Sequence, residues 1–499
     1  MSEGTLLPLL VIAGSLITGL CIFGLAEEKV RLRTALNLAG AIIKIFLVSW
    51  MLWGVYHGAQ YEVRLALIPN LDLVLQADTL SLFFLILSAG LWLVTTFYAI
   101  GYLEGSPYRS RFFGYFSLCV TSTSGVAMAG NLITFLLFYE MLTLVTYPLI
   151  VHRGTEEARR VGQSYLVYTL FGGTMLLLGT VWLYTLTNTL EFTPLGFMGS
   201  VNEAQYPTLI IIFFLLIVGV GVKTALIPLH CWLPQAMVAP APVSALLHAV
   251  AVVKAGAFGV VRIVYEVFGV TFAADLGVMG PLAIWAAMTI VYGSLRALFQ
   301  DDLKRRLAFS TVSQVSYIVL GVAIAGPVAT IGGIVHLVHQ GFMKITLFFC
   351  AGNFAETLGV HKVSQMNGIG RRMPLTMIAF TIGAFGMIGA PPIAGFISKW
   401  YLGMGALEAG QGWVIAVLVG SSLLNGAYFL PILHAAWFKE PPDQWPHAHD
   451  FGPKETAWAL LLPTLITAAF ALGAGLCASL SFSPLGWAKI IAAREFYLP

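Results

Sequence analysis

Long apolar stretches recur along the whole chain, and they constrain its fold more than any other feature. A helix needs about 20 mostly apolar residues to cross a bilayer, so these stretches predict membrane-spanning helices. Only 10% of the 499 residues are charged, well below the roughly one quarter that is usual in a soluble protein. We expect one all-α transmembrane domain of about 14 helices, near residues 6–25, 35–56, 79–101, 112–129, 131–151, 161–188, 208–229, 242–266, 276–298, 307–325, 328–355, 374–402, 411–438 and 457–481.

The distribution of lysine and arginine supports this number of spans and predicts their orientation. If the N-terminus lies outside, 17 of these residues fall in inside segments and 4 in outside segments, namely Arg64, Arg262, Lys489 and Arg494. This skew is what the positive-inside rule requires, and one span more or fewer would scramble it. We therefore expect a multi-pass protein of the bacterial inner membrane with both termini on the periplasmic side.

Two spans carry a lysine beside proline and glycine in mid-membrane. The seventh contains Lys223 just before Pro228, and the twelfth contains Pro391 and Pro392 just before Lys399. Proline opens a helix, and non-helical backbone at membrane depth is tolerated only beside a polar cavity. Two unrelated proline kinks would explain the same pattern, but the lysines favour two inverted five-helix repeats, spans 4–8 and 9–13. The expected divisions are residues 1–110, a first repeat at 111–267, a second at 275–438 and a last helix at 457–481.

Ionisable side chains occur deep in several spans, where they are expensive and usually functional. A lysine in a low dielectric releases its proton more easily, and a nearby carboxylate opposes that release, so moving the carboxylate can switch the lysine. Histidine titrates near neutrality and suits a relay position. The predicted proton pathway comprises Glu140, Lys223, His248, Lys254, His336, His339, Lys344 and Lys399.

A structural role is the alternative explanation for some of these residues. His336 and His339, three residues apart on one helix face, are as well explained as buried, hydrogen-bonded structural histidines. Lys44 is expected to snorkel or to pair near an interface. Asp78 precedes the third span and is expected to be a helix cap. A purely structural role is the poorer explanation for Glu140 and the lysines of the pathway.

Composition also excludes several functions. The net charge is only +3 and is spread out, which argues against a nucleic-acid partner. The five cysteines stand singly in apolar segments and have no zinc or iron–sulfur spacing, so no metal is expected. No glycine-rich nucleotide loop follows a predicted strand. We therefore expect no cofactor and no catalytic or redox site in this chain, although it could belong to a translocase complex.

One stretch has a distinctive motif. It runs Pro228-Leu-His230-Cys-Trp232-Leu-Pro234, then Pro240-Ala-Pro242-Val-Ser244-Ala-Leu-Leu-His248, then Lys254-Ala-Gly256. It resembles the signature of the proton-conducting antiporter-like family, which includes antiporter-like subunits of respiratory complex I, large subunits of Mrp-type cation/proton antiporters, the Mrp D type among them, and their relatives in membrane-bound hydrogenases. The resemblance continues through Phe138-Tyr-Glu140, Gly221-Val-Lys223, His336-Leu-Val-His339-Gln-Gly-Phe-Met-Lys344 and Pro391-Pro392 to Lys399, essentially the whole chain.

The resemblance implies roles for particular residues. Glu140 looks like the family's fifth-helix glutamate, and Lys223 looks like its ion-pair partner. Lys254, with His248, looks like the central relay, and Lys399 looks like the terminal lysine. The chain is too short for the longest complex I subunit, and the Ser-Ala-Leu-Leu-His form of the eighth span departs from the Mrp D pattern.

The leading functional hypothesis is a proton-translocating subunit of a multisubunit membrane complex, of the Mrp monovalent cation/proton antiporter type. Its partners would be other membrane subunits, protons and the lipid bilayer, with sodium as a further candidate ion. The alternatives are an antiporter-like subunit of an NADH-quinone oxidoreductase or membrane-bound hydrogenase complex, a self-sufficient secondary transporter, and a structural membrane anchor for a soluble catalytic partner.

Overall fold

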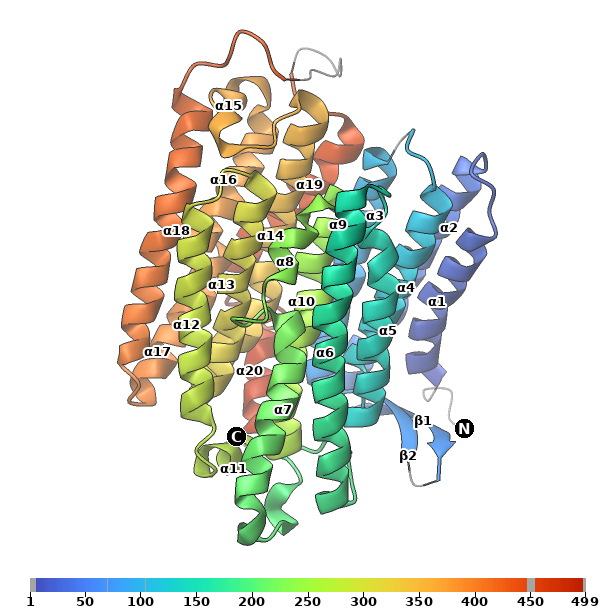
Figure 1. Ribbon diagram of the computed structural model, residues 1–499, viewed down its shortest axis with the longest axis vertical. Coiled ribbons are helices and arrows are strands. Elements are labelled where there is room, and N and C mark those ends of the chain that lie inside the picture. Colours follow the sequence, from blue (N-terminus) through green and yellow to red (C-terminus); the bar gives the residue numbers. More distant parts are fainter. Residues whose placement is uncertain (1–5, 70, 104, 447–453, 497–499) are drawn as a thin grey trace.

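The computed structural model describes residues 6–69, 71–103, 105–446 and 454–496. Long helices stand side by side in one bundle (Figure 1). Within the described residues, eleven helices are long and apolar enough to cross a membrane, and two shorter apolar helices, α1 and α16, stand with them. The predicted polytopic helical fold is confirmed.

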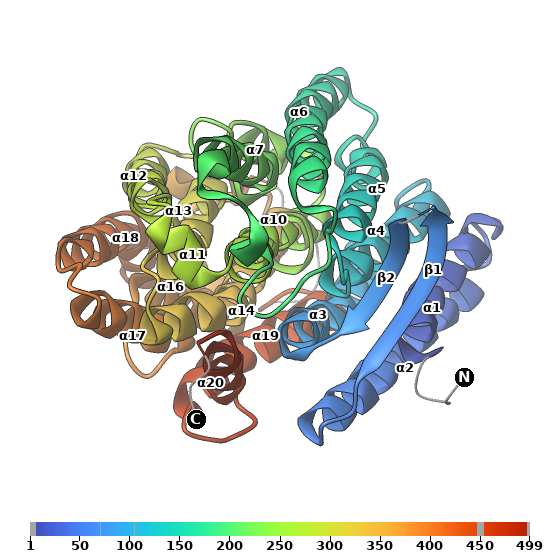
Figure 2. The same cartoon turned by 90° about the horizontal axis from the view of Figure 1, so that it is seen from below.

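The first three spans are α1 (Leu7–Phe23), α2 (Val30–Tyr56) and α3 (Thr79–Tyr102). Between α2 and α3 lies an antiparallel hairpin of β1 (Tyr61–Ile68) and β2 (Leu71–Ala77), which the pattern of apolar stretches did not predict. Figure 2 shows this hairpin beside α1, α2 and α3. A two-stranded hairpin is marginal alone, and here the Gln76 amide donates to the Met128 carbonyl at 2.7 Å and the Gly130 amide to the Val74 carbonyl at 2.9 Å.

The next helices form two sets, and the first helices of the two sets, α4 and α12, begin at opposite ends of the bundle (Figure 1). The third helix of each set has 32 residues, and the opposed directions support the predicted inverted repeat. The first set is α4 (Arg109–Ala127), α5 (Leu132–Ile150), α6 (Glu156–Thr187), α7 (Tyr206–Thr224), α8 (Trp232–Gln235), α9 (Ala241–Ala245), α10 (Val252–Arg262) and α11 (Val270–Asp275). The second is α12 (Met279–Leu298), α13 (Leu303–Ala323), α14 (Pro327–Leu358), α15 (Ile369–Arg372), α16 (Pro374–Ile388), α17 (Ala394–Glu408) and α18 (Trp413–Phe438).

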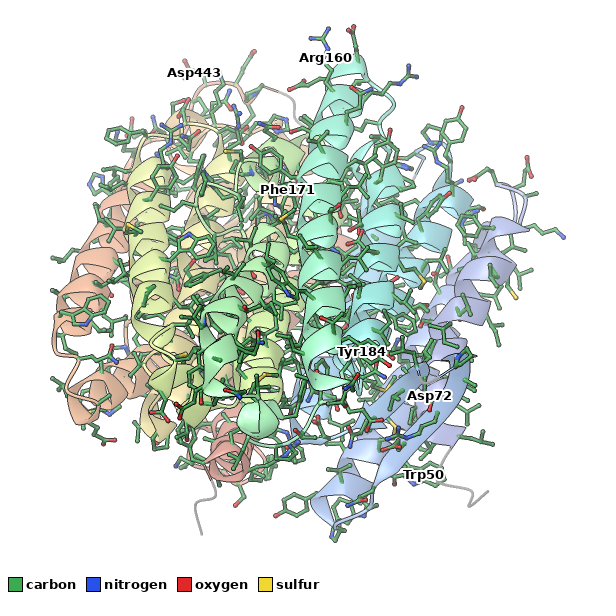
Figure 3. All side chains as sticks on the ribbon, turned by 60° about the horizontal axis from the view of Figure 1, so that its bottom comes forward. Trp50, Asp72, Arg160, Phe171, Tyr184 and Asp443 are labelled. Carbon is green, nitrogen blue, oxygen red and sulfur yellow. The ribbon has the colours of Figure 1, made fainter. Side chains whose placement is uncertain are left out.

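Two helices complete the described chain, the span α19 (Trp458–Leu476) and the short α20 (Pro484–Glu495). Short 3-10 turns occur at Met198–Ser200, Glu203–Gln205, Ala236–Val238 and Val363–Gln365. We call the end of the bundle with α15, where α2, α4 and α6 begin, the basic face, and the opposite end the hairpin face. Figure 3 places Arg160 and Asp443 at the basic face, with Asp72 and Trp50 toward the other end. Helices α1 and α20 put both ends of the described chain near the hairpin face.

Both predicted helix breaks are present. Helix α7 ends before Ala225, whose φ is +61°, and α16 ends before Gly389, whose φ is +98°. The twelfth span resumes as α17, but the seventh continues only as the four-residue α8. The eighth span differs from our expectation of a plain helix. It consists of α9, a π-helix at Leu246–Val250, α10 and a second π-helix at Ile263–Phe268, and π-helical segments occur frequently at functional sites.

The interior of the bundle is formed by the eighth span, α13 and α14, in which nearly every residue is buried. Helices α2, α6 and α18 instead leave many large apolar side chains exposed, as a lipid-facing surface requires. Because most of the predicted pathway residues lie on the buried helices, they belong to the interior of the fold.

A cluster of five charged residues joins three elements at the hairpin face. Asp78 caps α3 through the amide of Ser81, as expected, and accepts from Arg262 at 2.7 Å and from Arg494 of α20 at 3.0 Å. Glu266 pairs with the same two arginines. Arg262, which we counted among the outside cations, is therefore a buried residue of the eighth span.

Glu495 completes this cluster and gives it a pH dependence. Burial, with the negative charge of Glu266 beside it, raises the pKa of the Glu495 carboxyl to about 8. An unfolded glutamate has a pKa of about 4.3. Between these values the unfolded chain loses the proton and the folded chain keeps it, so this residue lowers stability as pH rises.

We expect Glu495→Gln to melt a few degrees higher than the wild type at about pH 8, with no difference at about pH 4, because glutamine cannot ionise beside Glu266. Thermal unfolding in detergent, followed by tryptophan fluorescence, measures this difference. The control is Glu408→Gln, since Glu408 is exposed at the end of α17. If the melting temperatures of Glu495→Gln and the wild type depend on pH in the same way, the raised pKa of Glu495 is contradicted.

Candidate proton-conducting site

The first part of the site lies where α5, α6 and α7 meet. Lys223 occupies the last turn of α7, and its amine donates to the backbone carbonyl of Tyr139 and lies 3.4 Å from the centre of that tyrosine's ring. Lys223 is fully buried. The break after α7 thus ends the helix at the lysine, and α5 supplies the amine's acceptor.

Glu140 lies next to Tyr139 on α5 but does not bond directly to Lys223. Among the described residues the two form no direct ion pair, and the buried Oε1 of Glu140 has no hydrogen-bond partner. The expected direct pair is therefore absent in this conformation, although the two charges are close enough to interact. The carboxylate packs on Gly173 of α6, where a Cβ atom would overlap it. Gly173, which sequence reasoning missed, makes room for this carboxylate.

The centre of the site is the irregular eighth span. His248 lies in the first π-helix, where its ring stacks on Phe348 at 4.4 Å and neither ring nitrogen has a hydrogen-bond partner within the described residues. Lys254 follows the break at Ala251, and its amine donates to the Leu337 carbonyl of α14 at 2.7 Å. The absence of Cβ at Gly256 lets α10 touch the backbone at Lys223 and Thr224. The central residues therefore adjoin the first part of the site.

The histidines of α14 have different surroundings. Nδ1 of His336 lies 2.8 Å from the Ser398 hydroxyl of α17, next to Lys399. His339, in contrast, has no hydrogen-bond partner on either nitrogen in the described part of the chain. Both residues of the predicted pair therefore lie near the second helix break, His336 bonded to Ser398 and His339 beside the Ala394 backbone at the start of α17.

Lys344 and Lys399 are joined by a continuous series of hydrogen bonds. The Lys344 amine donates to Ser310 Oγ at 2.7 Å, and the Tyr428 hydroxyl lies 2.8 Å from the same oxygen. Tyr428 also contacts Oδ1 of Asn425 at 2.7 Å. The Asn425 amide nitrogen donates to the Met387 carbonyl at 2.9 Å, and the Lys399 amine donates to that carbonyl at 3.0 Å.

The break in the twelfth span explains why Lys399 binds there. The last carbonyls of a helix have no partner within it, and α16 ends at Ile388, with two prolines following that have no amide hydrogen. Lys399 donates to the carbonyls of Met387 and Ile388, at 3.0 and 2.8 Å, and to Ser422 Oγ at 2.9 Å. The ammonium group thus satisfies backbone that the break leaves open.

Further polar groups line the same interior and were missed in the sequence. The buried side chains of Gln314, Tyr317 and Gln340 have polar atoms without a hydrogen-bond partner among the described residues. The ring of Tyr317 lies 5.3 Å from that of His336 and 5.4 Å from the Lys399 amine. Such buried groups are normally satisfied by internal water. The sequence signal that could have identified these residues is a polar side chain within an otherwise apolar span.

A cavity of about 330 Å³ at the basic face reaches the start of the eighth span. Lys304, Ala241 and Gly352 are among its lining residues. The Lys304 amine donates to the Ala239 carbonyl at 2.6 Å, so this residue supports the turn before α9. No group of three or more possible metal ligands occurs in the described residues.

The arrangement suits proton transfer between water and amines. It contains ionisable groups, hydroxyls and unpaired ring nitrogens, which can each accept and donate hydrogen bonds in turn. The hydrogen-bonded series links Lys344 to Lys399, while Lys254, His248 and the pair Glu140 and Lys223 contact neighbouring backbone or rings. The Met387 carbonyl in the series accepts from both Asn425 and Lys399 and has no proton to pass on. Proton transfer among all of these groups therefore requires water.

Comparison with known proteins is consistent with this geometry. Residues 129–425 match the family model described as NADH:quinone oxidoreductase/Mrp antiporter, TM, and residues 69–113 match NADH-Ubiquinone oxidoreductase (complex I), chain 5 N-terminus. The chain is 38% identical to the N subunit of the NADH-quinone oxidoreductase of Desulforudis audaxviator, over 75% of this chain and 74% of that protein. It is 29% identical to the D subunit of the Na(+)/H(+) antiporter of Bacillus subtilis, over 79% and 78%.

The fold is also that of a solved relative. A chain of the Mrp complex from Dietzia sp. superposes with a TM-score of 0.87 at 23% identity, and all of both chains is covered. The first family model spans more than half of the sequence. The chain therefore belongs to the family of transmembrane subunits shared by NADH:quinone oxidoreductases and Mrp antiporters.

Proposed function

We propose that this antiporter-like subunit translocates protons as part of a multisubunit membrane complex of the Mrp cation/proton antiporter type. The observation that carries the proposal is the hydrogen-bonded series from Lys344 through Ser310, Tyr428 and Asn425 to the Met387 carbonyl and Lys399. Its members lie on five helices, and it joins the buried amine of Lys344 to the half-buried Lys399. If the two lysines were only structural, each amine would need hydrogen-bond acceptors, but one series of hydrogen bonds would not need to link the two amines.

The lysines and histidines of the pathway act in sequence. Lys223, Lys254 and Lys399 each hold a proton and release it to neighbouring water, while His248, His336 and His339 lie between or beside them as relays. Glu140 controls Lys223. When the carboxylate approaches, it favours the charged amine, and when it withdraws, as in the unpaired geometry on Gly173, the amine releases its proton more readily.

The orientation of the protein in the membrane follows from its charges. We place the basic face in the cytoplasm and the hairpin face in the periplasm of a bacterial inner membrane, because the arginine-rich helix ends lie at the basic face. Protons from the cytoplasm would then reach the eighth span through the cavity beside Lys304.

Other membrane subunits are the proposed partners, because no energy source is expected in this chain. Similarity to the N subunit of an NADH-quinone oxidoreductase keeps a redox-driven complex as the second candidate. Transport by the purified chain and by the intact complex in vesicles separates these assemblies from a self-sufficient transporter. Robust cation/proton exchange by the chain alone would overturn the multisubunit proposal.

We expect Tyr428→Phe to interrupt the hydrogen-bonded series with little change in packing. Loss of a hydrogen bond worth about 1 kcal/mol at a rate-limiting transfer would slow proton movement roughly five- to tenfold. Proton uptake by vesicles that contain the intact complex, followed with a pH-sensitive dye, measures the rate. Tyr184→Phe on α6 is the matched control, since the Tyr184 hydroxyl lies outside the series. Equal rates for the two variants would contradict the proposed route.

We expect Glu140→Gln to reduce transport by about tenfold or more while the complex still assembles, because glutamine keeps the shape but cannot influence Lys223 by charge. Gly173→Ala should have a similar effect, because its Cβ would displace the carboxylate. Gly179→Ala, where the added Cβ would meet Leu216, controls for crowding on the same helix. If a soluble catalytic partner keeps its full activity and coupling in complexes that contain Glu140→Gln, the chain would instead be a structural membrane anchor.

A further inference from the structure

Lys44 is a buried lysine that lies outside the site described above. It was expected to snorkel toward an interface or to pair near one, and it does not snorkel, because the side chain is fully buried. Nearby residues of α2 such as Ile43 and Phe46 are exposed on its lipid-facing side. Lys44 therefore points inward from one of the most peripheral helices of the bundle.

The Lys44 amine is held by neutral groups from two helices. It donates to Ser15 Oγ of α1 at 3.0 Å, to Ser124 Oγ of α4 at 2.5 Å and to the Val120 carbonyl of α4 at 3.5 Å. The ring of Trp92 on α3 lies 5.5 Å away. Among the described residues, no carboxylate forms an ion pair with it. A charge buried in this way costs several kcal/mol, and such residues are usually functional.

A column of polar side chains leads from the basic face to Lys44. On α2, Arg33 and Asn37 precede Lys44 on the same buried face, and Arg33 donates to Ser110 at the start of α4 at 2.9 Å. On α4, Ser117, Thr121 and Ser124 continue the column, and Thr121 donates to Ser15 at 2.9 Å.

The column contains polar atoms without a partner, and on α2 it stops at Lys44. Asn37 Oδ1 and Ser117 Oγ are buried and have no hydrogen-bond partner in the described part of the chain, as is typical of groups that bind internal water. Beyond Lys44, toward the hairpin face, the buried residues of α2 are the apolar Val48 and Met51. On α2, the polar residues that could guide water to Lys44 thus lie on the side of the basic face.

Helix α4 separates Lys44 from the proposed proton pathway by one helix diameter. Lys44 binds the Val120 carbonyl on one side of α4. The adjacent Cys119 faces the other side, where its Sγ lies 3.4 Å from Thr146 of α5. A change of charge at Lys44 thus occurs directly across α4 from α5, the helix that carries Glu140.

We propose that Lys44 is an additional proton-binding site, filled from the basic face along this column, that modulates the Glu140 and Lys223 pair across α4. The neutral amine accepts a proton from hydronium in the column, leaving water, and returns it to water by the reverse step. The proposal rests on the proton-translocating function inferred above, and it adds a site in the N-terminal helices, outside both repeats.

The first test separates proton exchange from a purely structural tie. In vesicles that contain the intact complex, we expect Lys44→Met to lower transport about tenfold and to change the pH at which transport is half-maximal. Lys44→Arg should not rescue it, because a guanidinium group does not release its proton. An unchanged pH profile in folded Lys44→Met, or full rescue by Lys44→Arg, would overturn the proposal.

The second test leaves Lys44 in place and does not depend on transport. A membrane-impermeant thiol reagent, with labelled peptides identified by mass spectrometry, should modify Asn37→Cys from the side that also modifies Arg160→Cys, an exposed position at the basic face. Val48→Cys, the buried apolar control on the same face of α2, should stay unmodified from either side. No modification of Asn37→Cys, or its modification from the opposite side, would overturn the column.

The outcomes also distinguish the two proposals. If Glu140→Gln and Tyr428→Phe leave transport intact, the proposed function fails, whatever the thiol labelling shows. If those variants slow transport while Lys44→Met keeps the wild-type rate and pH profile, only the site at Lys44 fails.

Discussion

The interior of a bilayer offers no water to a backbone group that loses its partner, and this constraint shapes the centre of the bundle. Helix α16 stops in mid-span, so the carbonyls of Met387 and Ile388 need donors from elsewhere. Lys399 supplies one donor group and Asn425 another. The broken helix and the half-buried ammonium of Lys399 therefore depend on each other, since either alone would leave unsatisfied polar groups at depth.

The break after α7 meets the same constraint in another way. There the Val222 carbonyl accepts from the indole of Trp232 at 2.8 Å, so an aromatic side chain of α8 covers the open end. Lys223 is then free to reach α5 and bind at Tyr139. Although the two breaks correspond in the proposed repeats, the lysine of the second is fixed to its own break, and the lysine of the first is directed toward Glu140. This difference fits the proposed roles, in which Glu140 controls the charge on Lys223 and Lys399 is the last amine of the pathway.

Close contacts between helices join the two repeats. Gly256 brings α10 against the end of α7, and the π-helical turns of the eighth span aim His248 and Lys254 toward α14. The N-terminal helices take part in the same polar interior through Lys44, which shares α4 with the first half. The charged cluster at Asp78 and Arg262 ties α3, the eighth span and α20 together at the hairpin face. Buried charge in this protein thus lies both along its proposed pathway and at its edges.

The sequence by itself determined the helical membrane fold, because bilayer thickness and the cost of exposed backbone leave few choices for a chain with these apolar stretches. It also identified both breaks from proline and glycine, and identified the buried lysines from their cost alone. Only the tertiary structure decided which atoms these residues contact. The hairpin, the π-helices, the room that Gly173 makes for Glu140, the series from Lys344 to Lys399 and the inward turn of Lys44 all depend on how neighbouring helices rotate and approach. Apolar composition is nearly uniform around these helices, so it does not fix that rotation, and packing between small and polar side chains does.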